Sequence, residues 1–109
     1  MEQITAEALR DRLKQNAALH VLDVREREEY EANNIGAVLL PLSQLRNMDA
    51  EEIEGWEDEE VVVHCKSGKR SLEACMILQT LGFSKTINLI GGIEAWQEKY
   101  PGHSIRDGQ

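Results

Sequence analysis

Cys65 and the loop that follows it are the part of the chain with the clearest chemical potential. The cysteine comes directly after the apolar run 61–64, and the loop continues as Lys66-Ser67-Gly68-Lys69-Arg70-Ser71. Between a strand and the first turn of a helix, several backbone N–H groups lack helical partners and converge on one point. Such N–H groups stabilise an anion, and Gly68 frees the backbone to curl around it. The loop therefore predicts a solvent-facing thiolate at Cys65, which is the nucleophilic form of cysteine.

Charge in the loop supports the same interpretation. Lys66, Lys69 and Arg70 lie within five residues of the sulfur, and nearby cations lower the pKa of a thiol. We expect them, together with the helix terminus, to hold the pKa of Cys65 well below its ordinary value of about 8.5. The alternative is an inert core cysteine, for which so many cations make a poor environment.

The sequence gives less reason to assign a chemical role to the other cysteine or to the histidines. Cys75 lies on the predicted apolar side of the next helix, so we expect it to pack in the core, with a resolving role toward Cys65 as the alternative. His64 precedes Cys65 in one strand, where successive side chains point to opposite faces. We therefore interpret His64 as structural rather than as a base for the thiol. His20 and His103 receive no role.

Four short apolar runs are the candidate strands. They cover 19–24, 37–40, 61–64 and 86–90, and the runs 19–24 and 61–64 contain several branched residues. The run 61–64 resembles a strand buried on both faces, which makes it the candidate central strand. Strands that alternate with helices predict an α/β domain whose mainly parallel sheet of about five short strands has helices on both faces. The carboxyl ends of such strands share one rim, where we expect Asp23, Arg25 and Cys65.

Helices are expected between these strands. Thr5 is predicted to cap a helix that reaches about Gln15, and the charged run 25–31 suits an exposed helical turn. Ser43 is predicted to cap another short helix after Pro41, which stops the strand before it.

A longer helix is predicted over 71–81, directly after the Cys65 loop. Its apolar side is marked by Leu72, Cys75, Met76 and Leu78. Gly82 ends this helix, and Gly91-Gly92 opens a last one.

Length and composition predict one soluble globular domain. The 109 residues suit a single core, and 41% of them are apolar and 29% charged. We assign residues 1–109 to one domain, with its core at about 4–100 and a polar tail at 101–109. Two cysteines are too few for a disulfide framework and lack the spacing of zinc ligands. Without a signal peptide or a long apolar run, we expect a cytoplasmic protein that binds no membrane.

The net charge of −8 arises in one segment. Eight acidic and no basic residues fall within 49–60, whereas the other 97 residues carry twelve charges of each sign. We expect a solvated loop and short helix here, with a docking surface for a basic partner as the alternative. Because the chain has no basic stripe, we do not expect it to bind nucleic acid.

Several motifs along the chain resemble those of the rhodanese domain family. The first half carries Val21-Leu22-Asp23-Val24-Arg25-Glu26, Glu29-Tyr30-Glu31, Ile35-Gly36-Ala37 and Pro41-Leu42. The second half carries the Cys65 loop, which resembles the family's active-site loop, then Leu81-Gly82-Phe83 and Leu89-Ile90-Gly91-Gly92-Ile93-Glu94-Ala95-Trp96. The resemblance covers about residues 4–100. One departure is Asn34-Ile35-Gly36-Ala37, which is shorter than the family's His-Ile-Pro-Gly-Ala and lacks its histidine.

The resemblance implies a three-layer rhodanese-like fold and a thiosulfate sulfurtransferase (rhodanese) activity. In such an enzyme Cys65 takes sulfur from an anionic donor such as thiosulfate and passes it, as a persulfide, to cyanide, a thiol or a protein. The implied persulfide- and substrate-binding residues are Lys66, Ser67, Gly68, Lys69, Arg70 and Ser71. Asp23 and Arg25 are expected to support the loop as an ion pair. Neither a metal nor an organic cofactor is implied, and we expect a monomer or weak dimer.

Two other functions stay open. A cysteine phosphatase or arsenate reductase also uses a cysteine and an arginine, but only four residues separate Cys65 from Arg70, where phosphatases generally have five. A ring of N–H groups one residue shorter suits a single sulfur better than a phosphoryl group. The second alternative is a non-catalytic rhodanese-like interaction or regulatory module, although such modules often lack the cysteine.

Overall fold

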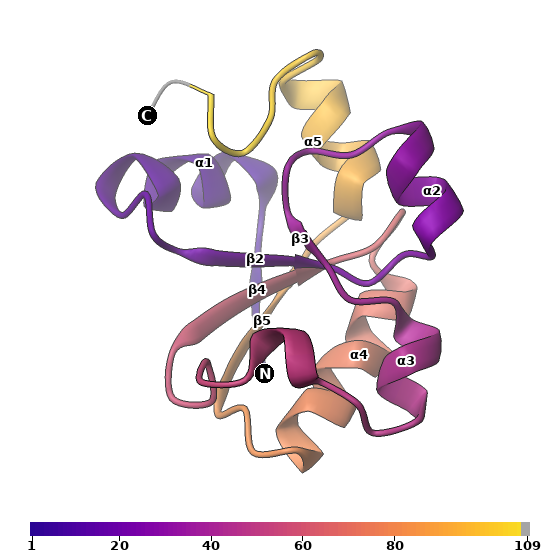
Figure 1. The fold of residues 1–109 in the computed structure, drawn as a ribbon. Helices are drawn as coiled ribbons and strands as arrows, with labels where there is room; N and C mark the ends of the chain where they lie inside the picture. The colour runs from indigo at the N-terminus through magenta and orange to yellow at the C-terminus, as the bar shows by residue number, and fades with distance from the viewer. Residues whose placement is uncertain (108–109) are drawn as a thin grey trace.

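The computed structural model describes residues 1–107, in which five parallel strands form one sheet between two layers of helices (Figure 1). The strands are β1 (Glu2–Ile4), β2 (His20–Asp23), β3 (Val38–Leu39), β4 (Glu60–His64) and β5 (Lys85–Leu89). The helices are α1 (Ala6–Gln15), α2 (Arg27–Ala32), α3 (Leu42–Arg46), the 3-10 turn η1 (Glu51–Ile53), α4 (Lys69–Thr80) and α5 (Gly92–Lys99). This architecture confirms the predicted α/β fold.

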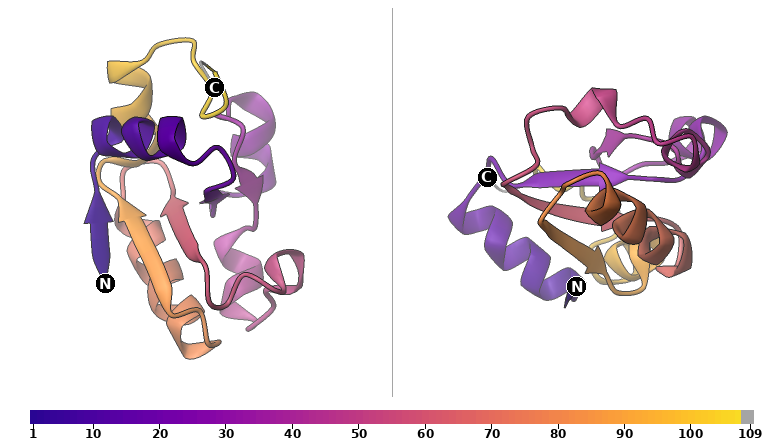
Figure 2. Two further views of the ribbon diagram at one scale, coloured as in Figure 1. Left: turned by 90° about the vertical axis from the view of Figure 1, so that its left-hand side faces the viewer. Right: turned by 90° about the horizontal axis from the view of Figure 1, so that it is seen from below.

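The sheet has the order β1-β5-β4-β2-β3, which puts β4 at its centre. Figure 2 (left) shows β1, β5 and β4 side by side. Because side chains alternate along a strand, β4 contributes to two cores. Val62 packs in the core beneath α1 and α5, whereas Val61 and Val63 pack in the core beneath α3 and α4. The apolar run that predicted a strand buried on both faces is therefore confirmed.

The first helix forms where its capping residue predicts it. α1 follows Thr5, whose Oγ1 accepts a hydrogen bond from the N–H of Ala8 at 3.1 Å. The capping prediction for Ser43 is wrong, because the N-cap lies two residues earlier, at Pro41, and α3 begins at Leu42. Pro41 has no N–H to leave unpaired at a helix start, and the Ser43 hydroxyl instead donates to Glu26 at 2.8 Å.

The α4 helix presents a different face to the core from the one predicted. Its buried side chains are Ser71, Ala74, Cys75 and Leu78. Leu72 and Met76, predicted on the apolar side, are 36% and 64% exposed. The hydroxyl of Ser71 is held inward by Asn88 and by Cys65. This contact fixes the rotation of the helix and turns Leu72 and Met76 outward.

The two ends of the chain add packing that the apolar pattern did not predict. β1 is a three-residue strand that pairs with β5 at the edge of the sheet. Ile105 is 1% exposed and belongs to the core beneath α1 and α5, and its N–H donates to the carbonyl of Ile35 at 2.8 Å. The predicted core limit near residue 100 is therefore too early. Residues 108–109 of the predicted tail lie outside the described part of the chain.

The acidic segment 49–60 is tied to the body of the domain at several points. Ile53 is fully buried in the core beneath α3 and α4. Trp56 stacks on the ring of His20 with centroids 3.8 Å apart, and Glu59 accepts a hydrogen bond from the same ring at 2.6 Å. The segment is thus more than a solvated loop, because an apolar anchor and an aromatic stack order it. Within residues 1–107, none of the helices has the length and hydropathy to cross a bilayer.

Candidate active site

The Cys65 loop lies where the central strand meets α4. β4 ends at His64, and the loop turns through Gly68, which has a φ of +107°, into the first residue of α4. His64 lies opposite Asp23 in the register of β4 and β2. The loop after β5 approaches from the other side, because the backbone N of Gly91 would lie 3.4 Å from a Cβ on Gly68. The predicted rim at the carboxyl ends of the strands therefore brings these segments together.

The sulfur of Cys65 lies among hydrogen-bonding groups of its own loop. The N–H of Gly68 donates to Sγ over 3.1 Å, and the thiol donates to the hydroxyl oxygen of Ser71 over 3.4 Å. A φ of +107° at Gly68 is readily available only to glycine, and it aims this N–H at the sulfur. The loop thus forms a small cup around a single atom.

Helix α5 fixes the orientation of this cup from behind. The N–H groups of Ile93 and Glu94 donate to the carbonyls of Cys65 and Lys66 at 2.9 and 3.1 Å. In a trans peptide the next N–H points away from the carbonyl, so these bonds turn the N–H groups of the loop away from α5. Gly92 makes this approach possible, because a Cβ there would lie 2.5 Å from the carbonyl oxygen of Cys65.

Opposing effects act on the pKa of the Cys65 thiol. Burial raises it, whereas the hydrogen bond with the Ser71 side chain and the hydrogen bonds from the backbone N–H groups of Ser71, Gly68 and Ser67 lower it. The hydrogen bonds prevail, and the pKa lies below its ordinary value. The direction agrees with the sequence prediction, but the causes are hydrogen bonds of the loop rather than the charges of Lys66, Lys69 and Arg70 that the sequence suggested.

The burial of Cys65 differs from the prediction of a solvent-facing thiol. The residue is only 1% exposed, because the loop closes over the sulfur to make its hydrogen bonds. Lys66 and Ser67, which follow it, are both exposed. The sulfur therefore lies just beneath an exposed loop and points into the cup rather than standing free in solvent.

The three cations of the loop have different environments. Arg70 forms a bidentate pair with Glu29 of α2, with nitrogen–oxygen distances of 2.7 and 2.8 Å, and this pair lowers the pKa of Glu29 to about 2. Among residues 1–107, neither Lys66 nor Lys69 forms an ion pair with a carboxylate. The charge available to an anionic ligand therefore comes from the two lysines, while Glu29 offsets that of Arg70.

The predicted pair of Asp23 and Arg25 is present and buried. The guanidinium NH2 group lies 2.9 Å from Asp23 Oδ2 and also donates to the carbonyl of Asn33 at 2.6 Å. On the other side, His64 places Nε2 3.6 Å from Asp23 and Nδ1 3.1 Å from the carbonyl oxygen of Cys65. Burial lowers the pKa of His64, which favours the neutral imidazole. In the described chain Asp23, Arg25 and His64 make no hydrogen bond to Sγ.

Cys75 has the environment predicted for a core cysteine. It is fully buried, and burial raises the pKa of its thiol to about 11. Both cysteines are free thiols. A thiol so difficult to ionise is a poor nucleophile, which favours core packing over a resolving role.

Three residues around the cup were not predicted as parts of the site. Asn88 of β5 accepts the hydrogen bond of the Ser71 hydroxyl, Glu29 pairs with Arg70, and Gly92 gives α5 room to approach. An amide side chain between the apolar residues Ile87 and Leu89 was an available signal for Asn88. Glu29 had no comparable signal, because it is one of several acids in a charged stretch.

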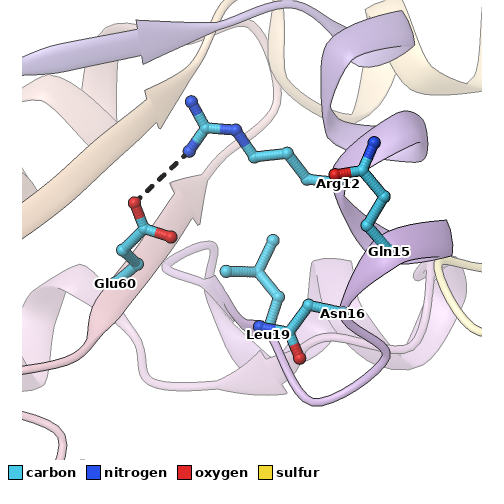
Figure 3. Close-up of a pocket in the computed structure, with 5 residues that line it drawn as sticks. All are labelled: Arg12, Gln15, Asn16, Leu19 and Glu60. Carbon is cyan, nitrogen blue, oxygen red and sulfur yellow. Dashed lines mark ion pairs between the residues drawn. The ribbon is translucent and has the colours of Figure 1, made fainter.

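One cavity shown in close-up lies away from the Cys65 loop. Arg12, Gln15, Asn16, Leu19 and Glu60 line a hollow of about 250 Å³ (Figure 3). Glu60 begins β4 and His64 ends it, so this hollow lies about 13 Å along the strand from the rim that carries the cysteine. Arg12 is paired with both Glu2 and Glu60, which leaves it little free charge for a ligand.

Comparison with known proteins gives consistent results. The family model "Rhodanese-like domain" matches residues 5–99. The human thiosulfate:glutathione sulfurtransferase is 34% identical over an alignment of 91 residues, and the match covers 72% of this chain and 79% of that protein. The solved structure of the human single-domain sulfurtransferase TSTD1 has a TM-score of 0.76 and 29% identity, and the match covers 91% of this chain and 97% of that one.

Another relative is a longer protein. The "Putative sulfur carrier protein YrkF" of Bacillus subtilis is 37% identical over 98 residues, which are 89% of this chain. The chain spans only 51% of the length of that relative. The family model nevertheless covers most of the chain, including the Cys65 loop and the two glycines at the start of α5. The chain therefore belongs to the rhodanese-like domain family.

Proposed function

We propose that this protein is a sulfurtransferase that carries sulfur as a persulfide on Cys65. The observation that carries the proposal is a thiol ringed by hydrogen-bond donors, which lower its pKa despite its burial. Such a cup stabilises the thiolate that attacks and the persulfide that results, because both are sulfur anions. The sulfurtransferase names of relatives with this domain support the same activity.

The proposed reaction has two displacement steps. The Cys65 thiolate attacks the outer sulfur of thiosulfate; the new Sγ–S bond forms, the bond to the sulfite sulfur breaks, and sulfite leaves with that electron pair. A nucleophile such as cyanide or a thiolate then attacks the outer sulfur of the persulfide. The Sγ–S bond breaks, and Cys65 returns as a thiolate, which the same donors stabilise. No further oxidant or reductant is needed.

The loop's charge favours an anionic donor. Lys66 and Lys69 are exposed and without a carboxylate partner in the described chain, so they attract an anion such as thiosulfate. Arg70, by contrast, is proposed to order the loop through Glu29 rather than to contact the donor. Ser67, Gly68 and Ser71 hold the persulfide through hydrogen bonds. Asp23 and Arg25 support the base of the loop. As part of this proposal we place the protein in the cytoplasm, whose reducing conditions keep both thiols free.

The alternatives have less support. A phosphatase needs an arginine free to bind phosphate, whereas Arg70 is engaged by Glu29. A purely non-catalytic module would need neither a cup of donors nor a lowered pKa at Cys65. Sulfur transfer is therefore the function that the geometry favours.

Mass spectrometry of the intact protein tests the proposal. Incubation with thiosulfate should add one sulfur atom to the wild type, and cyanide should remove it. Cys65→Ser should gain no sulfur, whereas the matched variant Cys75→Ser should gain it like the wild type. Absence of the adduct in the wild type, or its presence in Cys65→Ser, would contradict the proposal. Hydrolysis of an aryl phosphate that depends on Cys65 would favour a phosphatase instead.

A further inference from the structure

One face of α4 exposes apolar side chains directly beside the Cys65 loop. Leu72 is 36% and Met76 64% exposed, and Lys69 begins the same helix. These three residues are spaced i, i+3 and i+7, so they share one side of the helix. Together with Lys66 of the loop they are called the α4 face below. Its apolar members are those that the sequence pattern predicted to be buried.

The internal packing of the domain does not account for this exposure. α4 already buries Ser71, Ala74, Cys75 and Leu78 against the sheet. Glu73, next to Leu72, is taken up by the bidentate pair with Arg46 of α3. Leu72 and Met76 therefore remain exposed, one helical turn apart on the same side of α4. Their position next to the Cys65 loop and its lysines, rather than their area alone, suits a contact surface.

The charge of the α4 face indicates the chemistry of its partner. Lys66 and Lys69 have no carboxylate partner in residues 1–107, although the chain carries a net charge of −8. Arg46 and Arg70 nearby are both paired. Two uncompensated ammonium groups next to an apolar strip complement a surface that combines carboxylates with apolar side chains.

Size indicates a macromolecule rather than a small thiol. Met76 lies seven residues after Lys69, which is about 10 Å along the helix. Thiosulfate bound at the loop is too small to reach Met76, and glutathione, which is about 10 Å long when extended, would have to lie along the whole helix face to do so. A protein surface, in contrast, covers the loop and the strip together.

We propose that the α4 face docks an acceptor protein whose reactive thiol is flanked by carboxylates and apolar side chains. This inference rests on the proposed sulfurtransferase function. The docked thiolate attacks the outer sulfur of the Cys65 persulfide; a new S–S bond forms on the partner, and the Sγ–S bond breaks. The electron pair stays on Sγ as the thiolate, and the partner leaves as a persulfide. The lysines bring the acidic partner in, and Leu72 and Met76 hold it.

Peptide acceptors test this proposal. One peptide carries a single cysteine flanked by leucine and glutamate, its twin has lysine in place of glutamate, and glutathione is the small thiol. Each is assayed for sulfur received from the Cys65 persulfide, preloaded with thiosulfate and verified by mass. The wild type should favour the acidic over the basic peptide about tenfold in kcat/KM. Added salt should reduce this preference.

Variants separate docking from chemistry. The double variant Leu72→Ser and Met76→Ser should lower kcat/KM for the acidic peptide about tenfold, mainly through KM, and leave glutathione unchanged. Val38→Ser, which alters an exposed apolar residue of β3, should change neither.

Three results would overturn the docking proposal. They are equal use of the two peptides, an equal effect of the double variant on peptide and glutathione, and self-association of the wild type that the double variant abolishes. The last result would assign the α4 face to a second copy of the chain. A wild type that takes no sulfur from thiosulfate would instead refute the proposed function itself.

Discussion

Cys65 and Cys75 are ten residues apart, almost equally buried and yet opposite in their chemistry. Both have an exposed fraction of 1% or less. Burial raises the pKa of both thiols, but at Cys75 it prevails and brings the pKa to about 11, whereas at Cys65 hydrogen bonds outweigh it and lower the pKa. The difference shows that converging donors, more than exposure, distinguish a reactive from an inert thiol in this fold.

The two environments follow from local backbone structure. Cys75 lies within α4, where the backbone N–H groups are used by the helix itself. Cys65 lies before that helix, where the N–H groups have no helical partner and turn toward the sulfur. The site therefore exists because the strand ends and the helix begins within four residues.

The substitution Gly92→Ala should have the largest effect on the environment of Cys65. The added Cβ would lie 2.5 Å from the carbonyl of Cys65 at a φ of +58°, so α5 and the loop must separate and the donors turn away from Sγ. We expect the free energy of unfolding to fall by about 2–5 kcal/mol and sulfur transfer to be lost. Urea unfolding and the thiosulfate assay measure both.

Gly102→Ala is the matched control for that substitution. Gly102 also has a positive φ, of +78°, but a Cβ there meets no atom within 4 Å. It should cost only about 1 kcal/mol and leave transfer intact. Equal effects of the two substitutions would show that the contact of α5 with the loop does not shape the site.

A smaller loss of activity is expected from Ser71→Ala, which removes the side-chain hydrogen bond between Ser71 and Cys65. The pKa of Cys65 should move upward, toward the behaviour of Cys75, because burial then meets less opposition. The rate of persulfide formation at neutral pH should fall about tenfold, and its acidic limb should shift to higher pH. The pH dependence of persulfide formation measures this.

Ser67→Ala should leave that profile unchanged, because Ser67 acts on the thiol through its backbone N–H. A shift of the same size in both serine variants would indicate that loss of either hydroxyl disturbs the loop as a whole. The shift in Ser71→Ala would then not be evidence that the hydrogen bond between Ser71 and Cys65 lowers the pKa of the thiol.

Much of the fold and of the site could be predicted from the sequence. The contacts that make the environments of the two cysteines different could not. Local patterns are enough for α1 with its Thr5 cap, for the central strand and for the loop before α4. The three-residue β1 has too few residues to show a period and is held by pairing with β5.

The inward face of α4 could not be predicted because a polar residue determines it. Apolar periodicity favoured Leu72 and Met76, whereas the hydroxyl of Ser71 bonds Asn88, which is 17 residues away in the chain. Likewise the pair of Arg70 and Glu29 joins residues 41 apart. Such long-range polar contacts leave no local periodicity, so only the folded chain reveals them.

The smallest effect is expected from Arg70→Met, which removes the pair with Glu29. Both side chains are about one third exposed, so the free energy of unfolding should fall by about 0.5–1 kcal/mol at neutral pH. The folded-state pKa of Glu29 is lowered from 4.5 to about 2, so the pair stabilises fully above pH 4.5 and this contribution is lost as the pH falls toward 2. Urea unfolding of the wild type and of Arg70→Met should show that the difference between their free energies of unfolding decreases as the pH falls over that range.

The same variant also tests whether charge or hydrogen bonds control the pKa of Cys65. Because Glu29 offsets the charge of Arg70, Arg70→Met should move the titration of Cys65 less than Ser71→Ala does. A larger movement in Arg70→Met would mean that cationic charge, rather than the ring of donors, controls the thiol.

Titration of each thiol alone measures the difference in acidity between the two cysteines. Cys75→Ala leaves only Cys65, Cys65→Ala leaves only Cys75, and thiolate absorbance in the ultraviolet follows ionisation in both. We predict that Cys65 ionises below the ordinary range of a cysteine and Cys75 near pH 11. If Cys65 instead ionises at or above the ordinary value, the cup of donors does not hold an anion and the account is contradicted.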